Sequence, residues 1–268
     1  MNSGVVAQPF DLEFFLPMEP IPPVESFPIP APRFNGASRS VEAGNALDWL
    51  RQGWAIFIVN PGAWIAMMVI LIVIYLALSI VPLIGHLAAF VLTPLLAAGM
   101  LLACQKVAHE KTLEISDLFA GFQRSTGALA TLGVLYMLAM LIVGLLVFLL
   151  AGGGLAGGLM MANPVGVGVA LSSIFMAGLL GMLLSVPIVM AIWFAPALVL
   201  FNQMPAVDAL KASFNACLRN VVVFLVYGLI SMVLCFFAAL PAGLGFLVLG
   251  PVLAGSVYAS YRDIFIAD

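Results

Sequence analysis

The sequence predicts an all-α fold, a polytopic membrane helix bundle of six transmembrane helices arranged as three units, each a short elbow helix followed by a membrane hairpin. Three observations support this prediction. The 268 residues are 64% hydrophobic and only 8% charged, whereas soluble domains are about 25% charged. Six apolar runs are each long enough to cross about 30 Å of hydrocarbon. The basic residues are concentrated between alternate runs.

Residues 1–38 are predicted to form a disordered, proline-rich and acidic cytoplasmic tail, and residues 39–268 a six-helix transmembrane domain. The tail holds eight of the 17 prolines and has no helical periodicity. Such a composition is typical of disordered or polyproline-like segments. Because its start lacks basic residues and an apolar core run, we do not expect a signal peptide. The first membrane helix would then serve as the targeting signal.

The tail contains one stretch, FDLEFFLPMEP (10–20), in which apolar side chains alternate with carboxylates. Apolar residues concentrated in a disordered segment often become ordered when they bind a partner. The two interpretations are a docking motif and a low-complexity tail without a specific use. The predicted docking residues are Phe10, Leu12, Phe14, Phe15 and Leu16.

The six apolar segments differ mainly in length. The fourth is the longest and contains Pro187 and Pro196, so we expect it to be tilted or kinked. A glycine-rich stretch (151–168) precedes it, and the sequence leaves open whether this stretch enters the membrane. The segments are placed at residues 62–83, 86–105, 128–151, 169–200, 221–240 and 242–261.

The charged residues predict the topology. Lys106, Lys111 and Arg124 lie between the second and third segments, and Lys211 and Arg219 between the fourth and fifth. The turns after the first, third and fifth segments contain no charged residue. By the positive-inside rule, both termini and both charged loops of this multi-pass protein are expected to be cytoplasmic.

A repeated pattern predicts the three units. The stretches FVLTPLLAAGM (90–100) and LVLGPVLAGSV (247–257) share a proline in register, with a weaker third copy in the fourth segment. Helix kinks are therefore predicted at Pro94, Pro187 and Pro251. Ahead of each odd-numbered segment, two apolar residues four positions apart share a helical face, as in Leu50 with Trp54, Leu118 with Phe122, and Leu210 with Phe214. The alternative to duplication is a chance similarity of apolar runs.

Residues at the membrane boundaries fit this arrangement. Asn60 and Asn220 each precede an apolar segment and are expected to cap the entering helix. A proline directly after Asn60 is well placed at the first helical position. Indole rings prefer the membrane interface, so we expect three interfacial anchors, Trp49, Trp54 and Trp64.

The apolar segments contain no Asp, Glu, Lys or Arg in their hydrocarbon-spanning parts. Pumps, proton-coupled transporters and intramembrane hydrolases usually place such a group there, so the sequence argues against these classes. A ridge of small residues in the fourth segment would let another helix approach closely. Its members are predicted to serve helix packing, within the chain or in a dimer, with a substrate path as the alternative. They are Ser173, Ala177, Gly181 and Ser185.

No metal, cofactor or catalytic site is predicted. The potential ligands near His109 lie in a charged loop without a recognised metal spacing, and His86 lies in a short turn. The stretch GGGLAGG lacks the Lys-Ser or Lys-Thr of a phosphate-binding loop. The three cysteines show no close spacing and are expected to act as small apolar residues. They are Cys104, Cys217 and Cys235.

Three stretches carry a resemblance to a known family, namely WLRQGWAIFIVNPGAWIAMMVIL (49–71), DLFAGFQR (117–124) and FAPALVLFNQMPAVDALKASFNACLRN (194–220). Together they resemble uncharacterised six-helix bacterial inner-membrane proteins over residues 45–265. More distantly, the chain is similar to the membrane domain attached to some bacterial glycerophosphodiester phosphodiesterases, although no catalytic domain is present. The resemblance implies a fold and an inner (cytoplasmic) membrane location, and it implies no site residues.

These observations favour a non-enzymatic scaffold, accessory or assembly component. Its expected partners are membrane lipid, a protein that binds the tail and a second copy of the chain, but not nucleic acid, because the net charge is only −3. The alternative is a permease or handler of an uncharged or lipid-like solute, which would use the proline-kinked helices to line a cavity. An enzyme is not expected, because no nucleophile, base and orienting group share a recognisable spacing.

Overall fold

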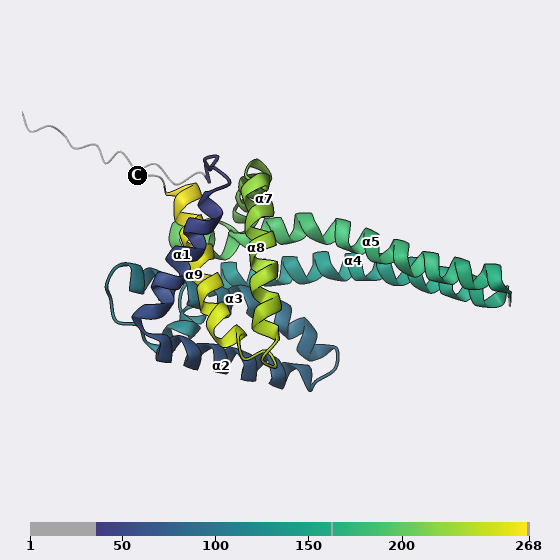
Figure 1. Cartoon of the computed structure of the whole chain (residues 1–268), viewed down its shortest axis with the longest axis horizontal. Helices are drawn as coiled ribbons and strands as arrows, with labels where there is room; N and C mark the ends of the chain where they lie inside the picture. Colours follow the sequence, from purple (N-terminus) through teal and green to yellow (C-terminus); the bar gives the residue numbers. More distant parts are fainter. Residues whose placement is uncertain (1–35, 162, 267–268) are drawn as a thin grey trace, which may run out of the picture. The chain divides into compact units, whose positions relative to one another are not determined.

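A computed structural model describes residues 36–161 and 163–266, which belong to one unit of the chain, Phe34–Asp268. These residues form helices joined by turns and loops, without a strand, so the all-α prediction is confirmed (Figure 1). The helices are α1 (Asn45–Val59), α2 (Pro61–Ser79), α3 (Ile84–Ala108), the 3-10 helix η2 (Ile115–Phe122), α4 (Thr126–Met160), α5 (Pro164–Trp193), α6 (Ala195–Asn202), α7 (Ala206–Arg219), α8 (Val221–Ala239) and α9 (Phe246–Phe265).

Five stretches of the described helices are long and apolar enough to cross a membrane. They are α2, α3, α4, the run from Pro164 to Asn202 that comprises α5 and α6, and α8. Helix α9 has 20 residues, but polar residues such as Tyr261, Arg262 and Asp263 occupy its second half. The described residues therefore contain five candidate spans, and the sixth predicted span stays a prediction.

Local sequence signals explain where two of these helices begin. The Asn60 side chain accepts a hydrogen bond of 3.2 Å from the backbone N–H of Ala63, and Pro61 occupies the first turn of α2. The predicted Asn60 cap is therefore confirmed. Asn163 caps α5 in the same way, accepting a 2.8 Å hydrogen bond from Gly166 N–H, again with a proline directly after it. Each cap satisfies a backbone donor that the helix leaves unpaired.

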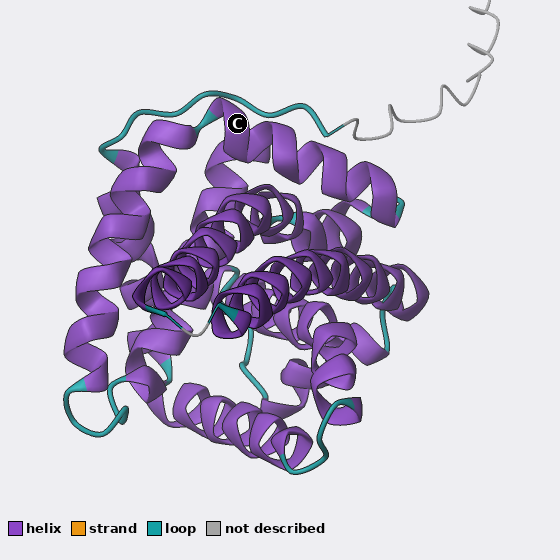
Figure 2. Ribbon diagram, turned by 90° about the vertical axis from the view of Figure 1, so that its right-hand side faces the viewer, coloured by secondary structure: helices purple, strands orange, loops and turns teal. Residues whose placement is uncertain are grey.

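Helices α4 and α5 pack side by side as an antiparallel hairpin (Figure 1). The 35 residues of α4 correspond to about 52 Å at 1.5 Å per residue, which exceeds the hydrocarbon thickness of about 30 Å. Its outer residues are apolar and mostly exposed on all sides of the helix, as expected for a surface in contact with lipid. In Figure 2 the hairpin points toward the viewer, and the other helices surround its base.

The glycine-rich stretch forms the tip of this hairpin and is helical except around its turn. A Cβ atom added to Gly158 would lie 2.3 Å from the backbone oxygen of Gly166, and one added to Gly154 would lie 2.1 Å from the Cβ atom of Ser173. The absence of side chains at these positions lets the two backbones approach closely. The stretch is therefore a packing surface rather than a loose connector.

The hydrophobic core lies where α1, α3, α6, α7 and α9 meet. Large side chains that are almost completely buried there include Trp49, Phe194, Leu198 and Tyr261. Helices α1 and α9 cross closely at Gly53, where an added Cβ atom would lie 2.1 Å from the backbone oxygen of Val252. This crossing brings the start of α1 beside the end of α9, where Asn45 donates a hydrogen bond to Asp263.

Candidate functional site

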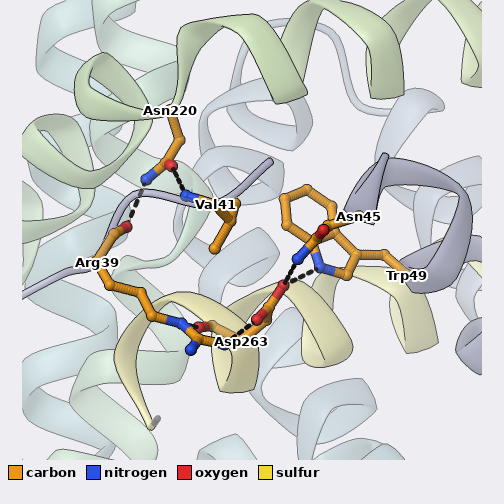
Figure 3. Close-up of polar contacts among 6 residues, drawn as sticks. All are labelled: Arg39, Val41, Asn45, Trp49, Asn220 and Asp263. Atoms are coloured by element: carbon orange, nitrogen blue, oxygen red, sulfur yellow. Dashed lines mark hydrogen bonds and ion pairs between the residues drawn. The ribbon is translucent and has the colours of Figure 1, made fainter. Parts of the chain in front are cut away.

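The carboxylate of Asp263, at the end of α9, joins three separate parts of the chain (Figure 3). Its Oδ2 atom accepts hydrogen bonds from the Asn45 amide (2.8 Å) and the Trp49 indole N–H (2.9 Å), both on α1. The Arg39 guanidinium forms an ion pair with Oδ1 and donates to the Asp263 backbone oxygen. The carboxylate thus holds the segment before α1 and α1 itself against α9.

The Asn220 side chain holds the same segment from the other side (Figure 3). Its oxygen accepts a 2.9 Å hydrogen bond from Val41 N–H, and its amide donates to the backbone oxygens of Arg39 (3.0 Å) and Ala216 (2.9 Å). The predicted Asn220 cap of α8 is therefore wrong, because the side chain makes no capping hydrogen bond to that helix. Arg219 adds a 2.6 Å hydrogen bond to the Ser38 backbone oxygen.

The surroundings of Asp263 lower its pKa. Partial burial alone raises the pKa, but hydrogen bonds from Asn45, Trp49 and Arg39, together with the Arg39 charge, outweigh it. A carboxylate whose pKa is lower in the folded state stabilises the fold above its unfolded pKa, and this contribution is lost as pH falls through the folded pKa. The attachment of residues 36–44 should therefore weaken as the pH falls below about 4, the ordinary value for aspartate.

Substituting Asp263→Asn is expected to release residues 36–44 at neutral pH. An amide has one acceptor oxygen where the carboxylate serves donors on both, and it loses the charge that pairs with Arg39. The hydrogen-exchange protection factors of these residues should fall about tenfold, and they should no longer decrease further as the pH falls through the pKa of Asp263. The control is Asp48→Asn, which removes an exposed ion pair with Arg51 and should leave exchange unchanged. Equal exchange in the wild type and Asp263→Asn would contradict the assignment.

A second polar region lies between α3 and α4. Lys106 forms a 2.5 Å ion pair with Asp117, whose side chain is only 6% exposed and also accepts a 2.9 Å hydrogen bond from Glu114 N–H. Glu114 and Asp117 thereby form a capping box at the start of η2. The cations of the loop surround a hollow of about 200 Å³ lined by Leu102, Gln105, Lys106, His109, Lys111 and Arg124.

The helical hydrogen bonding between α5 and α6 is interrupted at Phe194. The side chain of Ser213 on α7 pairs with the two backbone groups that the interruption leaves free. The Ser213 hydroxyl accepts a hydrogen bond from Phe194 N–H (2.9 Å) and donates one to the Met190 backbone oxygen (2.7 Å). These two backbone groups would bond to each other in an uninterrupted helix. Pro196 cannot continue the ladder, because it has no N–H and its ring clashes with the preceding turn.

An apolar cavity of about 310 Å³ lies beside this break, between α5, α7 and α8. Trp193, Phe224 and Tyr227 line it with aromatic rings, and Cys217 contributes its thiol. Burial raises the pKa of Cys217 to about 12, against a smaller lowering by Ser213, so the thiol is protonated at neutral pH and is a poor nucleophile. A second hollow of about 220 Å³, lined by residues that include Tyr136 and Pro187, adjoins α5 as well.

Comparison with known proteins identifies a relative of this chain. A probable inner membrane protein of Burkholderia thailandensis is 33% identical over 231 residues, which cover 82% of each chain. The chain belongs to the family of this inner membrane protein. No family model matches the sequence, and no solved structure matches it. The predicted resemblance to bacterial inner-membrane proteins is confirmed at this level, whereas nothing supports the more distant likeness to glycerophosphodiester phosphodiesterases.

The predicted site residues of this family member fall in different environments. Trp49 and Trp64 are buried, with their indole N–H groups donating to Asp263 and to the Ile56 backbone oxygen, whereas Trp54 is 51% exposed. Burial within the protein does not fix the depth of a side chain in the membrane, so an anchoring role at the interface stays a prediction for all three tryptophans. The predicted docking residues (Phe10, Leu12, Phe14, Phe15 and Leu16) lie outside the described residues.

The small-residue ridge of α5 lies on its less exposed face. Ala177 is buried, and a Cβ atom added to Gly181 would lie 2.8 Å from the Val147 side chain on α4. Ser173 lies opposite Gly154, also on α4. Ser185 is half-buried.

The three prolines that were predicted to kink their helices all lie inside helices: Pro94 in α3, Pro187 in α5 and Pro251 in α9.

Sequence reasoning missed the residues that organise these sites, namely Arg39, Asn45, Trp193, Ser213 and Asp263. Arg39 and Asp263 are 224 positions apart, so no local spacing connects them. The available signal for Asp263 was a lone carboxylate in the last turn of an apolar helix, next to the basic residue Arg262. A carboxylate is unfavourable at a helix C-terminus unless it has its own cationic partner.

Proposed function

We propose that this protein is a non-enzymatic, multi-pass scaffold, accessory or assembly component of the inner membrane, with both termini cytoplasmic. The observation that supports it best is the attachment of residues 38–41 to the ends of α7 and α9 by Arg219, Asn220 and Asp263. The attached segment begins at Ser38, the last residue of the predicted tail. The tail would therefore leave the membrane domain from a fixed point, as expected of a segment that presents a binding motif.

Six spans in three units are part of this proposal. Each of the short amphipathic helices α1, η2 and α7 precedes two long helices in the chain. The start of α8 and the end of α9 are linked through residues 39–41, which contact both Asn220 and Asp263. This pairing supports α9 as the return crossing of a hairpin, with its charged end beside the basic end of α7.

The test compares complexes isolated from gently solubilised membranes. We expect full-length protein to retain a stoichiometric protein partner that a variant lacking residues 1–38 loses, while both insert equally into the membrane. In a matched variant, serine replaces the five apolar docking residues and the acidic residues are kept. Loss of the partner from this variant would show that the apolar side chains, and not the charge of the tail, bind it. An unchanged complex in both variants would refute docking through the tail.

The second candidate function is the handling of an uncharged or lipid-like solute. Two apolar hollows, of about 310 and 220 Å³, lie against α5 near its proline-containing turn, and the described part of α4 and α5 contains no charged residue. Movement of a fluorescent neutral lipid between leaflets of reconstituted vesicles, measured against protein-free vesicles, tests this function. Equal rates in both would refute it.

A further inference from the structure

We propose that the cavity between α5, α7 and α8 binds the ester-bearing end of a membrane lipid acyl chain, with the Trp193 indole N–H donating to the ester carbonyl. The inference deepens the second candidate function, because it gives that function a site and a ligand class. It depends on unsatisfied polar atoms, on the lining of the cavity and on the cavity's place in the helices.

Among the described residues, the buried side-chain polar atoms without a hydrogen-bond partner are Trp193 Nε1 and Ser231 Oγ, and both residues line this cavity. Ser231 interacts with the hydroxyl of Tyr227, so the inference rests on Trp193. An indole N–H only donates, and leaving it unpaired in apolar surroundings costs free energy. The missing partner must therefore be a hydrogen-bond acceptor.

The remaining lining selects an apolar body for the same ligand. Val186, Val189, Met190 and Leu225 contribute aliphatic or thioether surface. Trp193 meets the rings of Phe224 and Tyr227 edge-on, with centroids 6.1 and 6.2 Å apart, which positions the indole at the cavity wall. A volume of about 310 Å³ accommodates part of a lipid rather than a whole one. No charged side chain lines the cavity.

The position of the cavity identifies the source of the ligand. Leu225 is 67% exposed and Val186 is 49% exposed, and both belong to helices that are candidate membrane spans. The cavity therefore opens toward hydrocarbon. Trp193 is the last residue of α5, and Cys217 lies two residues before the cation Arg219. Because a cation near the end of an apolar helix is expected at the membrane interface, we infer that this end of the cavity lies near the depth of the glycerolipid ester carbonyls.

The experiment measures lipid binding to purified full-length protein by native mass spectrometry. Trp193→Phe keeps an aromatic ring and removes the N–H, and it should weaken binding of an ester-linked phosphatidylglycerol about fivefold. Gly228→Leu should abolish binding by filling the cavity, since Gly228 lines it and has open space beside it. The control is Trp54→Phe, at an exposed tryptophan outside the cavity, which should change nothing.

A second comparison tests the acceptor itself. A diether lipid with the same headgroup lacks the carbonyls, so it should bind the wild type about as weakly as the ester lipid binds Trp193→Phe. Equal binding of ester and ether lipids, or wild-type binding by Trp193→Phe, would overturn the inference. Lipid binding that depends on Trp193 without lipid movement in vesicles would uphold the inference and refute the second candidate function. Lipid movement that Trp193→Phe and Gly228→Leu leave unchanged would uphold that function and overturn the inference.

Discussion

Substituting Gly53→Ala is expected to lower the free energy of unfolding by about 3 kcal/mol, the upper part of the range for overpacking. The added Cβ atom would lie 2.1 Å from the Val252 backbone oxygen and 2.8 Å from the Ser256 backbone nitrogen. Both contacts are to backbone atoms, which cannot move aside as a flexible side chain can. Helices α1 and α9 must therefore separate at their crossing.

The consequence reaches beyond the crossing, because α1 also carries Asn45 and Trp49 to Asp263. The variant should melt at lower temperature in mild detergent and exchange amide hydrogens faster over residues 36–44. The control is Gly144→Ala on α4, where an added Cβ atom has open space and where alanine raises helix propensity. A melting temperature for Gly53→Ala equal to that of this control would show that the helices are not in contact there.

Much of the fold follows from local sequence signals. Long apolar runs must form helices in lipid, because each backbone polar group has to be satisfied within its own segment. This constraint explains why the predicted segments from 62–83 to 221–240 each overlap a long helix. The Asn60–Pro61 pair marked a helix start for the same reason, since capping depends on neighbours in sequence.

The sites could not be predicted in this way, because they depend on contacts between distant segments. The residue type of Trp49 gave no indication that its buried indole donates a hydrogen bond to Asp263. Asn220 was expected to cap α8 from its position, but its side chain binds residues 39–41. In both cases the hydrogen-bond partner belongs to a segment at least 179 positions away in the chain, so no local spacing indicates it.

The structure of the glycine-rich stretch (151–168) likewise could not be predicted from its composition. Dense glycine is compatible with a flexible connector or with close helix packing, and composition does not separate the two. The choice depends on what lies opposite, here Ser173 beside Gly154 and Gly166 beside Gly158. Similarly, a cavity is a property of several helices together, so the role of Trp193 had no sequence signal.

Substituting Ser213→Ala is expected to lower the free energy of unfolding by about 2–4 kcal/mol, because one buried and one part-buried backbone group each lose a partner at about 1–2 kcal/mol. Phe194 N–H and the Met190 backbone oxygen both depend on this hydroxyl. They cannot recover the loss simply by bonding to each other. Such a bond would straighten the chain into α6, where the Pro196 ring clashes with the preceding turn.

The matched control is Ser260→Ala on α9. Its hydroxyl is equally buried but donates only to the Val257 backbone oxygen within its own helix, so its removal leaves no backbone donor unpaired and should cost less than about 1 kcal/mol. Thermal unfolding in mild detergent compares the two variants. If Ser213→Ala and Ser260→Ala have the same melting temperature, the break at Phe194 is held by packing of Phe194 and Leu198 in the core. If the melting temperature of Ser213→Ala is well below that of Ser260→Ala, the Ser213 hydroxyl maintains the bend that shapes the cavity beside Trp193.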